Sequence, residues 1–517
     1  MKKTVFIFFL FSVNTFVYPQ QYFNFRFDFG QSGWWDGATN VFQLPDGYII
    51  GGGNAYYSPS RLGFYKIDIE GNRIFSKVYS DTVDEYYLGN PGSIVRLNDS
   101  VIVASGSRNS PDTNWLHQEG LIYFLNNNFD TLYTKYFGEK ISPVDTSYIF
   151  RQIKSNRETL VVTGGKNPKG LPTRALLIKT DQAGNEFWEK VYWDGMYDEG
   201  LSVICTNDGG YAIGGYTFDF LPPPNLTGDP IVIKTDSVGN QQWFKNYGTP
   251  YIDSHGMICS TQDGNMVLGF GYCDSMSGGG PSTEGNPFRK ITFIKIDNSG
   301  NTIWNKKYGK SEGELELVNI RENSDGTIIS TGITTKFFPT AYKYVGWILK
   351  TTSDGDSLWY RQYDICKGES TWNWLYDVIE TSDKGYIACG VVYPQEPDTG
   401  SQDGWVLKVD SIGCENPEDC WVGMKDEAPL PANDEIEIYP NPVAEDISVK
   451  LRITGNEMRI SIRLYDMFGR MVKMVELSPG QTEFRMDVSQ LPHGMYYVVV
   501  SQGDKIHTCR KLIKQRM

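Results

Sequence analysis

The sequence predicts an all-β protein: a seven-bladed β-propeller closed by its N-terminal strand and followed by a small immunoglobulin-like β-sandwich. Three observations support this prediction. Strand-and-turn motifs recur with a nearly constant period, the last repeat lacks a strand that an N-terminal segment can supply, and a separate run of alternating strands ends the chain. With 54 Gly, 25 Pro and 14% aromatic residues among 517, the composition is typical of strands and turns.

The first segment, residues 1–20, has the pattern of a secretory signal peptide. Lys2 and Lys3 precede the apolar run TVFIFFLFSV, which is too short to span a bilayer and ends in a polar break. No second apolar run is long enough to anchor the chain. We therefore expect a mature protein that leaves the cytoplasm and does not span a membrane.

The repeats combine two motifs. An Asp turn followed by a strand occurs as DGYIIGGGNA, DGGYAIGGYT, DGNMVLGFGY, DGTIISTGIT and DKGYIACGVV, which begin at Asp46, Asp208, Asp263, Asp325 and Asp383. A second motif follows, as in LLIKTDQAGNEFW, and its tryptophans at 188, 243, 304 and 359 are 55, 61 and 55 residues apart. A period of this size made only of strands predicts propeller blades.

Each repeat divides into four strands joined by tight turns. Asp-Gly and D-x-x-G-N tolerate the positive φ that such hairpins need, and the Trp of the fourth strand is expected to pack between blades. A calcium site at the D-x-x-G-N turns is not favoured, because one or two carboxylates fall short of the roughly six to eight oxygens that calcium takes. The Asp box of sialidases also lies at a hairpin, but its spacing differs. These motifs therefore serve folding.

The repeats number seven, and the first and last are linked. The second is degenerate, since it lacks the Asp-Gly turn and has Leu132 or Tyr133 in place of Trp. The last has no fourth strand after Gly413, whereas FRFDFG at 25–30 matches WFKNYG at 243–248. We expect the N-terminal strand to complete the last blade within a propeller of residues 21–420, which hides both sheet edges.

Cysteines and charge restrict the remaining possibilities. Of the eight cysteines, only Cys414 and Cys420 in CENPEDC form a plausible local disulfide, and the other six permit fifteen pairings that we leave open. The net charge of −14 argues against a nucleic-acid partner, because no basic stripe is present to neutralise phosphates.

The C-terminal part differs in composition. Residues 421–435 form a linker rich in Pro and acidic residues, and 436–517 contain alternating strands of an antiparallel sandwich. Four motifs occur there in order: Tyr439-Pro440-Asn441-Pro442, LYDMFGR with Gly469, LPHGMYYVVV with Gly494, and RKLIK.

These four motifs resemble the C-terminal sorting domain of the Bacteroidetes type IX (Por) secretion system. The resemblance implies export through the periplasm and outer membrane by that machinery, removal of the domain by a cysteine transpeptidase, and attachment to surface lipopolysaccharide or release. An ordinary immunoglobulin-like binding module is the alternative. The propeller repeats resemble bacterial repeats of the DGGY…GG…IKTDxxGNxxW type and, more loosely, kelch and PQQ-like blades, which specify fold rather than function.

Catalytic motifs are scarce in the repeats. They contain two histidines, His117 and His255, and no Gly-rich phosphate loop, so we expect no metal, no cofactor and no His-based triad. Acidic residues recur where one blade leads into the next; they include Asp36, Asp198, Glu199 and Asp253. A glycosidase could use two such carboxylates, but their recurrence favours a repeated structural hydrogen bond.

Aromatic residues in the same loops form the predicted ligand site, because aromatic faces stack on sugar rings or anchor a protein partner. Packing between blades is an alternative role for the tyrosine of this set, whereas the Trp pair of the last repeat has no counterpart in most other repeats. We expect a non-enzymatic module that binds glycan or protein; the alternative is an extracellular hydrolase acting on polysaccharide. The candidate residues are Trp34, Trp35, Tyr197, His255, Trp372 and Trp374.

Overall fold

A computed structural model describes the chain apart from residues 1–20, 30–35, 55–59, 80–83, 110–117, 139–145, 157, 169–170, 194–196, 220–226, 252, 274–288, 310–314, 339–340, 417–434, 453–459, 467–470, 479, 503–504 and 516–517. It has two compact units, Met1–Asp410 and Ser411–Met517. All regular elements in the described ranges are β-strands. The predicted signal peptide and nearly all of the predicted linker lie outside these ranges.

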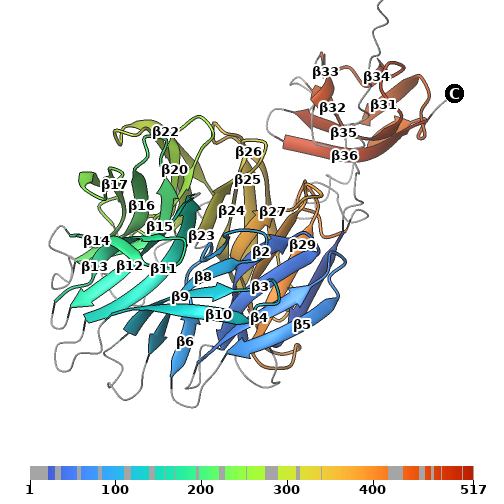
Figure 1. The fold of residues 1–517 in the computed structure, drawn as a ribbon. Coiled ribbons are helices and arrows are strands. Elements are labelled where there is room, and N and C mark those ends of the chain that lie inside the picture. Colours follow the sequence, from blue (N-terminus) through green and yellow to red (C-terminus); the bar gives the residue numbers. More distant parts are fainter. Residues whose placement is uncertain are drawn as a thin grey trace, which may run out of the picture. The chain divides into compact units, whose positions relative to one another are not determined.

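The first unit begins with five antiparallel sheets that follow one another along the chain (Figure 1). The first contains β2 (Asp36–Leu44), β3 (Gly47–Asn54), β4 (Arg61–Ile67) and β5 (Arg73–Tyr79). The second contains β6 (Glu85–Leu88), β7 (Ile94–Arg96), β8 (Ile102–Asn109), β9 (Gln118–Leu125) and β10 (Thr131–Phe137). The third contains β11 (Thr146–Asn156), β12 (Thr159–Pro168), β13 (Arg174–Asp181) and β14 (Glu186–Tyr192).

The fourth and fifth sheets have the same four-stranded order. The fourth contains β15 (Tyr197–Cys205), β16 (Tyr211–Asp219), β17 (Thr227–Thr235) and β18 (Gln241–Asn246). The fifth contains β19 (Met257–Ser260), β20 (Met266–Tyr272), β21 (Lys290–Ile296) and β22 (Thr302–Tyr308).

The remaining strands of the first unit form one eight-stranded sheet with two halves. One half contains β23 (Leu315–Glu322), β24 (Ile328–Phe337), β25 (Tyr342–Thr351) and β26 (Ser357–Tyr363). The other contains β27 (Trp372–Glu380), β28 (Tyr386–Tyr393), β29 (Asp403–Val409) and the N-terminal strand β1 (Phe23–Phe27). A parallel bridge between Tyr344 and Trp372 joins the halves.

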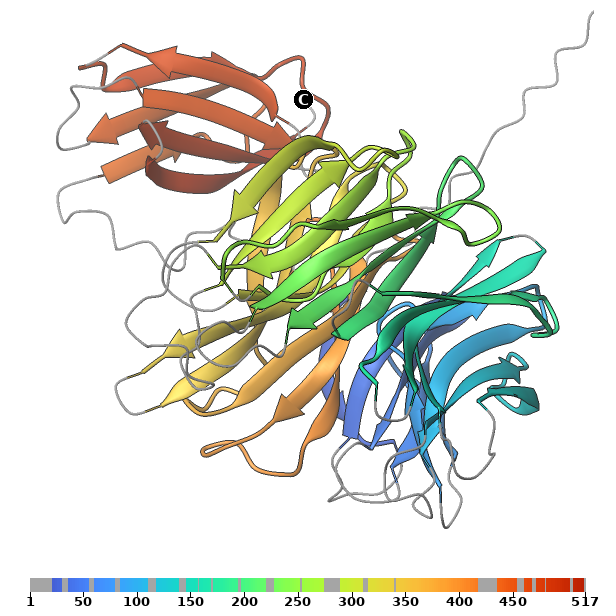
Figure 2. The ribbon, with the colours of Figure 1, turned by 90° about the vertical axis from the view of Figure 1, so that its left-hand side faces the viewer.

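The first strand of each sheet or half-sheet contacts the first strand of the next. In the second sheet β6 and β7 both pair with β8, and β7 makes this contact. The contacts run from β2 to β7, β11, β15, β19, β23 and β27, and β27 in turn contacts β2. The end of the first unit therefore lies beside its beginning, as the neighbouring orange and blue strands show in both ribbon views (Figures 1 and 2).

Buried polar side chains connect these first strands to one another. Asp377 accepts a hydrogen bond from the backbone N–H of Val41 (3.0 Å) and another from Asn319 Nδ2 (2.5 Å), and it also pairs with Arg321. Gln152 donates to the carbonyl of Pro91 and accepts from the N–H of a residue in β15. Such bonds satisfy backbone groups that the sheets leave unpaired. The residues in this role are Asn40, Gln152, Ser202, Asn319 and Asp377.

The D-x-x-G-N turns form self-contained hairpins, as predicted. In the turn that begins at Asp236, one carboxylate oxygen accepts from the N–H groups of Val238 and Asn240, and the other accepts from Asn240 Nδ2. Gly239 has a φ of 80°, which glycine adopts without strain. Because the protein's own donors occupy the carboxylate, the turn is a folding motif. Turns at Asp68, Asp181 and Asp297 repeat these bonds.

The Asp-Gly turn and the Lys of the second motif are partners, which the sequence did not indicate. Lys234 is fully buried on β17, and its Nζ lies 2.7 Å from the carboxylate of Asp208. Each Asp turn quoted from the sequence has its Lys, and the second sheet, which lacks the Asp-Gly turn, has Phe124 at the Lys position. The ion pairs are Asp46–Lys66, Asp208–Lys234, Asp263–Lys295, Asp325–Lys350 and Asp383–Lys408.

Aromatic residues of the fourth strands pack on the next sheet. Trp188 contacts Gly239 so closely that a Cβ there would lie 2.8 Å from the indole, and Trp243 donates from Nε1 to the carbonyl of Asn298 (2.9 Å). Tyr192 donates to the Gly239 carbonyl (2.8 Å). The Trp residues therefore lie between neighbouring sheets, as predicted.

The N-terminal strand completes the last half-sheet. β1 pairs antiparallel with β29, and Phe23 is opposite Lys408, the position that Trp243 takes opposite Lys234. The predicted register, which placed Phe25 at the Trp position, is wrong by two residues. The error is possible because β-strands alternate with period two, so a two-residue shift keeps the aromatic side chains on the same face. Phe23 packs on Gly71 of the first sheet, as Trp188 packs on Gly239.

The second unit consists of two antiparallel sheets around one core. One sheet contains β30 (Glu435–Tyr439), β31 (Asp446–Arg452) and β34 (Glu483–Asp487). The other contains β32 (Ile460–Asp466), β33 (Met471–Leu477), β35 (Gly494–Gln502) and β36 (Lys505–Lys514). Both contribute to the core, for example through Val449 and Ile462.

The predicted motifs of the second unit lie at strand ends. Tyr439-Pro440 and Asn441-Pro442 are both cis, and Asn441 Oδ1 accepts a hydrogen bond from the N–H of Ile513 (2.9 Å). This bond ties the Y-P-N-P segment to the last strand. Gly494 begins β35, and Gly469 lies outside the described residues.

Candidate functional site at the centre of the first unit

One residue in several of the first strands is displaced by a β-bulge. In β27, for example, the pairing with β28 shifts between Leu375 and Asp377, which leaves Tyr376 unpaired. Bulges redirect side chains and are common beside binding sites. The residues at these shifts are Thr39, Arg151, Leu201, Val318 and Tyr376.

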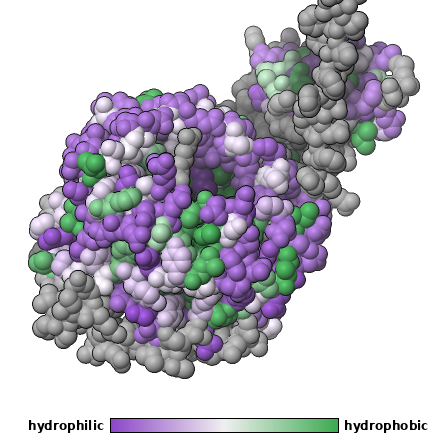
Figure 3. Space-filling model, viewed as in Figure 1, coloured by the Kyte–Doolittle hydropathy of each residue, from purple (hydrophilic) through white to green (hydrophobic). Residues whose placement is uncertain are grey.

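All five bulge residues line a single cavity of about 590 Å³. The cavity lies where the first strands meet, and its lining residues come from the sheets of the first unit and, at the fifth sheet, from His255 just before β19. In Figure 3 the face of this unit is mainly hydrophilic, and hydrophobic residues flank a hollow. The other lining residues are Leu88, Gly89, Asn90, Pro91, His255, Glu316, Ile333, Tyr344 and Trp374.

Aromatic rings form one side of the cavity. Trp374 is perpendicular to Tyr344 (83°, centroids 5.5 Å apart) and to Tyr376 (90°, 6.2 Å). Trp372 stacks parallel to Trp374, with an interplanar angle of 3° and centroids 5.2 Å apart. All four side chains are half-buried, so the rings are fixed by one another and still reach solvent.

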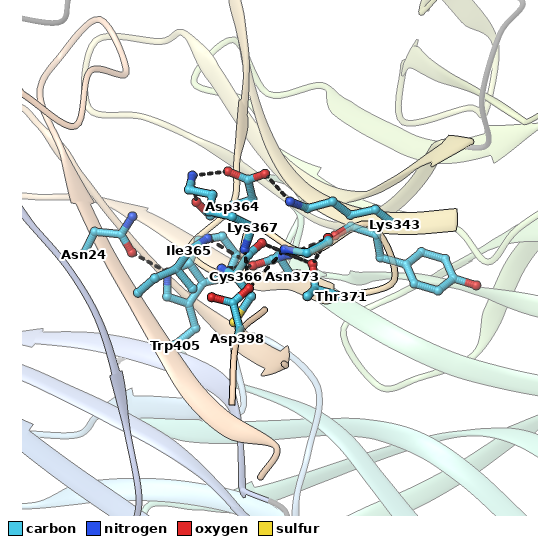
Figure 4. A network of polar contacts seen from close by, with 12 residues as sticks. Asn24, Lys343, Asp364, Ile365, Cys366, Lys367, Thr371, Asn373, Asp398 and Trp405 are labelled. Carbon is cyan, nitrogen blue, oxygen red and sulfur yellow. Dashed lines mark hydrogen bonds and ion pairs between the residues drawn. The ribbon is translucent and has the colours of Figure 1, made fainter. Parts of the chain in front are cut away.

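A buried hydrogen-bond network holds the Trp pair in place (Figure 4). Asn373, between the two tryptophans, is fully buried; its Oδ1 accepts from the N–H groups of Ile365 (3.0 Å) and Cys366 (2.8 Å). Its Nδ2 donates to the carbonyl of Tyr344 (3.2 Å). Since side chains alternate along a strand, anchoring Asn373 on one face fixes both indoles on the other. Asp398 further restrains the preceding loop by accepting from the N–H of Lys367.

Charged residues lie on other parts of the wall. Arg151 Nε donates to one oxygen of Glu199 (2.6 Å), whose other oxygen accepts from the Tyr197 hydroxyl (2.9 Å). Burial lowers the pKa of His255, although the carboxylate of Glu316 opposes this effect. The cavity thus combines a guanidinium, an imidazole and a carboxylate with a wall of aromatic rings.

The predicted site residues divide into three groups. His255 and Trp374 line the cavity, whereas Trp372 supports Trp374 from behind. Tyr197 is not a lining residue, and its hydroxyl donates to Glu199. Trp34 and Trp35 lie outside the described residues.

The recurrent acids have structural partners or are deeply buried. Asp253 accepts hydrogen bonds from the N–H groups of Thr249 and Cys273 and is 1% exposed. Asp198 is fully buried, and Glu199 pairs with Arg151. Asp36 is also buried, facing other carboxylates at the junction with β1. These four acids are therefore not lining residues.

The lining residues that were not predicted include all the other charged and aromatic side chains of the wall: Arg151, Glu316, Tyr344 and Tyr376. All four lie within strands, and Arg151 and Tyr376 are bulge residues. The signal that could have found Arg151 and Tyr376 is their place just before the recurrent buried polar residue, a position that holds Thr, Arg, Leu, Val or Tyr in different repeats.

The lining residues that the structure describes include no cysteine. Within the described ranges, no group of three or more His, Cys, Asp or Glu residues could hold a metal ion. Cys414 is disulfide-bonded, and its predicted partner Cys420 lies outside those ranges. Five further cysteines are free thiols: Cys205, Cys259, Cys273, Cys366 and Cys389.

Fold and site together define an all-β repeat protein with a ligand-sized cavity at the centre of its first unit. The second unit carries the type IX (Por) secretion tail, because residues 437–515 match the family described as the secretion system C-terminal sorting domain. This domain indicates export and interaction with the secretion machinery. No helix in the described part of the chain is long and apolar enough to cross a membrane.

Comparisons with other proteins give distant similarities. No curated protein matches the chain. It is similar to an α-L-arabinanase of Penicillium chrysogenum complexed with arabinobiose (12% identity, covering 61% of this chain and 92% of the other, TM-score 0.38). It is also similar to Sqt1 of Chaetomium thermophilum bound to the N-terminus of the ribosomal protein L10 (10% identity, covering 76% of this chain and 100% of the other, TM-score 0.38). A third similar structure is the GH93 α-L-arabinofuranosidase of Fusarium graminearum with arabinobiose (12% identity, covering 74% of this chain and 97% of the other, TM-score 0.36). Values this low carry no conclusion about activity.

Proposed function

We propose that this is an exported binding protein whose first unit is a closed seven-bladed propeller that binds a glycan in its central cavity. The contact of β27 with β2 and the pairing of β1 with β29 support the closed ring. A shared core between two antiparallel sheets supports an immunoglobulin-like sandwich for the sorting domain.

The aromatic wall is the observation that carries the glycan proposal. Sugar rings have apolar faces that pack on aromatic side chains, while their hydroxyls bond to polar groups at the rim. Trp374, Tyr344 and Tyr376 supply the apolar surface, and Arg151 and His255 supply polar groups. A cavity of about 590 Å³ lies within the range of small-molecule sites, which is about 300–1,000 Å³.

Binding is favoured over hydrolysis by the carboxylates of the wall. Glycosidases generally need two carboxyl groups, about 5 to 9 Å apart. Among the lining residues that the structure describes, Glu316 is the single carboxylate. Asp36, Asp198 and Asp253 are buried elsewhere, and Glu199 is held in its ion pair with Arg151, so none of these acids supplies the second group.

A glycan array with the mature protein tests this function. Trp374→Ala should abolish binding to any glycan found, and Thr39→Trp should do the same by filling the cavity from another part of its wall. Trp193→Ala, at an exposed tryptophan outside the lining, is the matched control and should bind normally. Binding that survives both cavity variants, with unchanged thermal melting, would place the site elsewhere.

Export is tested separately from binding. We propose that the chain passes through the periplasm of a Bacteroidetes cell and reaches its surface or the medium. A chain truncated before Asp434 should accumulate in the periplasm, whereas a reporter carrying residues 1–20 and 436–517 should leave the cell. Normal surface or medium levels of the truncated chain would contradict this assignment.

A further inference from the structure

Glu316 gives the cavity a negative charge that no neighbouring side chain neutralises. It lies on β23, is half-buried and lines the cavity. In the described part of the chain, no Lys or Arg forms an ion pair with it. A carboxylate held half-buried without a counter-ion is placed to receive one from a ligand.

The other charged groups of the wall do not compensate Glu316. Arg151 is paired with Glu199 at 2.6 Å, so these two charges cancel. Burial favours the neutral form of His255 by lowering its pKa. The net charge of the wall is therefore negative, and it favours a cationic group over a carboxylate.

The rings beside Glu316 also favour a cation. Tyr344 and Tyr376 are each perpendicular to Trp374, which makes a corner of aromatic walls rather than one flat platform. Burial and the Glu316 carboxylate together raise the pKa of Tyr376, which shows that Glu316 and this ring are electrostatic neighbours. Aromatic rings attract cations through their quadrupoles, most strongly where water is excluded.

Building on the glycan proposal, we propose that Glu316 and the corner formed by Tyr344, Trp374 and Tyr376 bind the protonated amine of an amino sugar. The amine would donate to the Glu316 carboxylate, and the sugar ring would pack on the aromatic wall. An acetylated amine carries no charge, so N-acetyl sugars should bind less tightly at the same site.

The test compares a chitosan oligosaccharide, made of glucosamine, with a chitin oligosaccharide of the same length, in which each amine is acetylated. Calorimetry at about pH 5, below the pKa of glucosamine amines, should show roughly tenfold tighter binding of chitosan. Glu316→Gln keeps the side-chain shape and should remove this preference. Glu70→Gln, at an exposed turn residue, is the control for a general change in charge.

Each outcome separates this inference from the glycan proposal. Equal binding of both oligosaccharides, or a preference that persists in Glu316→Gln, overturns the amine site but leaves glycan binding standing if Trp374→Ala abolishes it. Failure to bind chitosan also overturns the amine site, even if neutral glycans bind on the array. Loss of the preference in Glu316→Gln, with the affinity for chitin unchanged, supports it.

Discussion

Replacing Asp36 by Asn should stabilise the first unit at neutral and alkaline pH. Asp36 begins β2 and is 4% exposed, and it faces Asp28, just after β1, and Asp403, the first residue of β29. One oxygen of Asp36 and one of Asp28 are buried without a hydrogen-bond partner. Burial and the two neighbouring carboxylates raise the pKa of Asp36 from 3.8 to about 7.

The magnitude follows from the pKa shift. Each pKa unit corresponds to about 1.4 kcal/mol, so ionising Asp36 in the folded protein costs at most about 4 kcal/mol, and we expect about 2 kcal/mol once the site relaxes. A raised pKa means that the folded state holds the proton more tightly. The contribution of protonated Asp36 to the free energy of unfolding is therefore complete below about pH 4, declines between about pH 4 and pH 7, and stays low above that range. The amide introduced by Asp36→Asn would carry no charge and could still donate to Asp28.

The assay is urea unfolding followed by tryptophan fluorescence. All 13 tryptophans precede residue 436, so this signal does not report the sorting domain. The difference in unfolding free energy between Asp36→Asn and wild type should grow from near zero at about pH 4 to about 2 kcal/mol at about pH 8. Asp99→Asn, at an exposed turn, is the control. A variant that is less stable than wild type at the alkaline end would refute this reasoning.

Four further substitutions test the scaffold in three places. Asp208→Asn should lower the free energy of unfolding by about 2 kcal/mol, because it leaves the fully buried Lys234 ammonium without its counter-ion. Lys234→Met should change it little, and equal losses for the two variants in urea unfolding would contradict this account. Phe23→Ala should destabilise the first unit by about 2 kcal/mol by opening its junction with the first sheet, and unchanged unfolding would show that this contact is dispensable. Asn373→Ala should cost about 3 kcal/mol and weaken glycan binding, and normal binding by the folded variant would show that the Trp pair needs no such anchor.

Much of the scaffold could be predicted because its determinants are local. The hairpins at Asp68 and Asp236 need only a carboxylate, a glycine and an asparagine at fixed spacing, and this motif can be recognised in the amino-acid sequence. The closing strand was found for a different reason: a missing strand at one end matched an unpaired aromatic segment at the other. Its register was two residues off because alternation determines the face of a strand and not its position.

The site was only partly predictable because it depends on strand register. Trp374 was identified because the Trp pair has no counterpart in most other repeats, and His255 because it lies in the same loops between blades. Arg151 and Tyr376 were missed because a bulge, which aims them at the cavity, is decided by pairing with the next strand. Glu316 was not a candidate, since the recurrence of acidic residues between blades favours a structural role; the structure places it on β23.

The structure separates the residues that hold the repeats together from those that face the cavity. The Asp turns pair with buried lysines, the D-x-x-G-N turns bind their own backbone, and the Trp residues pack between sheets; none of these groups lines the cavity. Beside each bulge, a buried polar residue such as Gln152 or Asp377 bonds to a neighbouring first strand, which fixes the bulge in place. The bulge residue itself makes no such bond in β15 or β23, where it is Leu201 or Val318. The bulge residue can therefore be threonine, arginine or tyrosine in different repeats without altering the contacts on which the fold depends. Ligand chemistry and stability are thus set by different residues of the same strands.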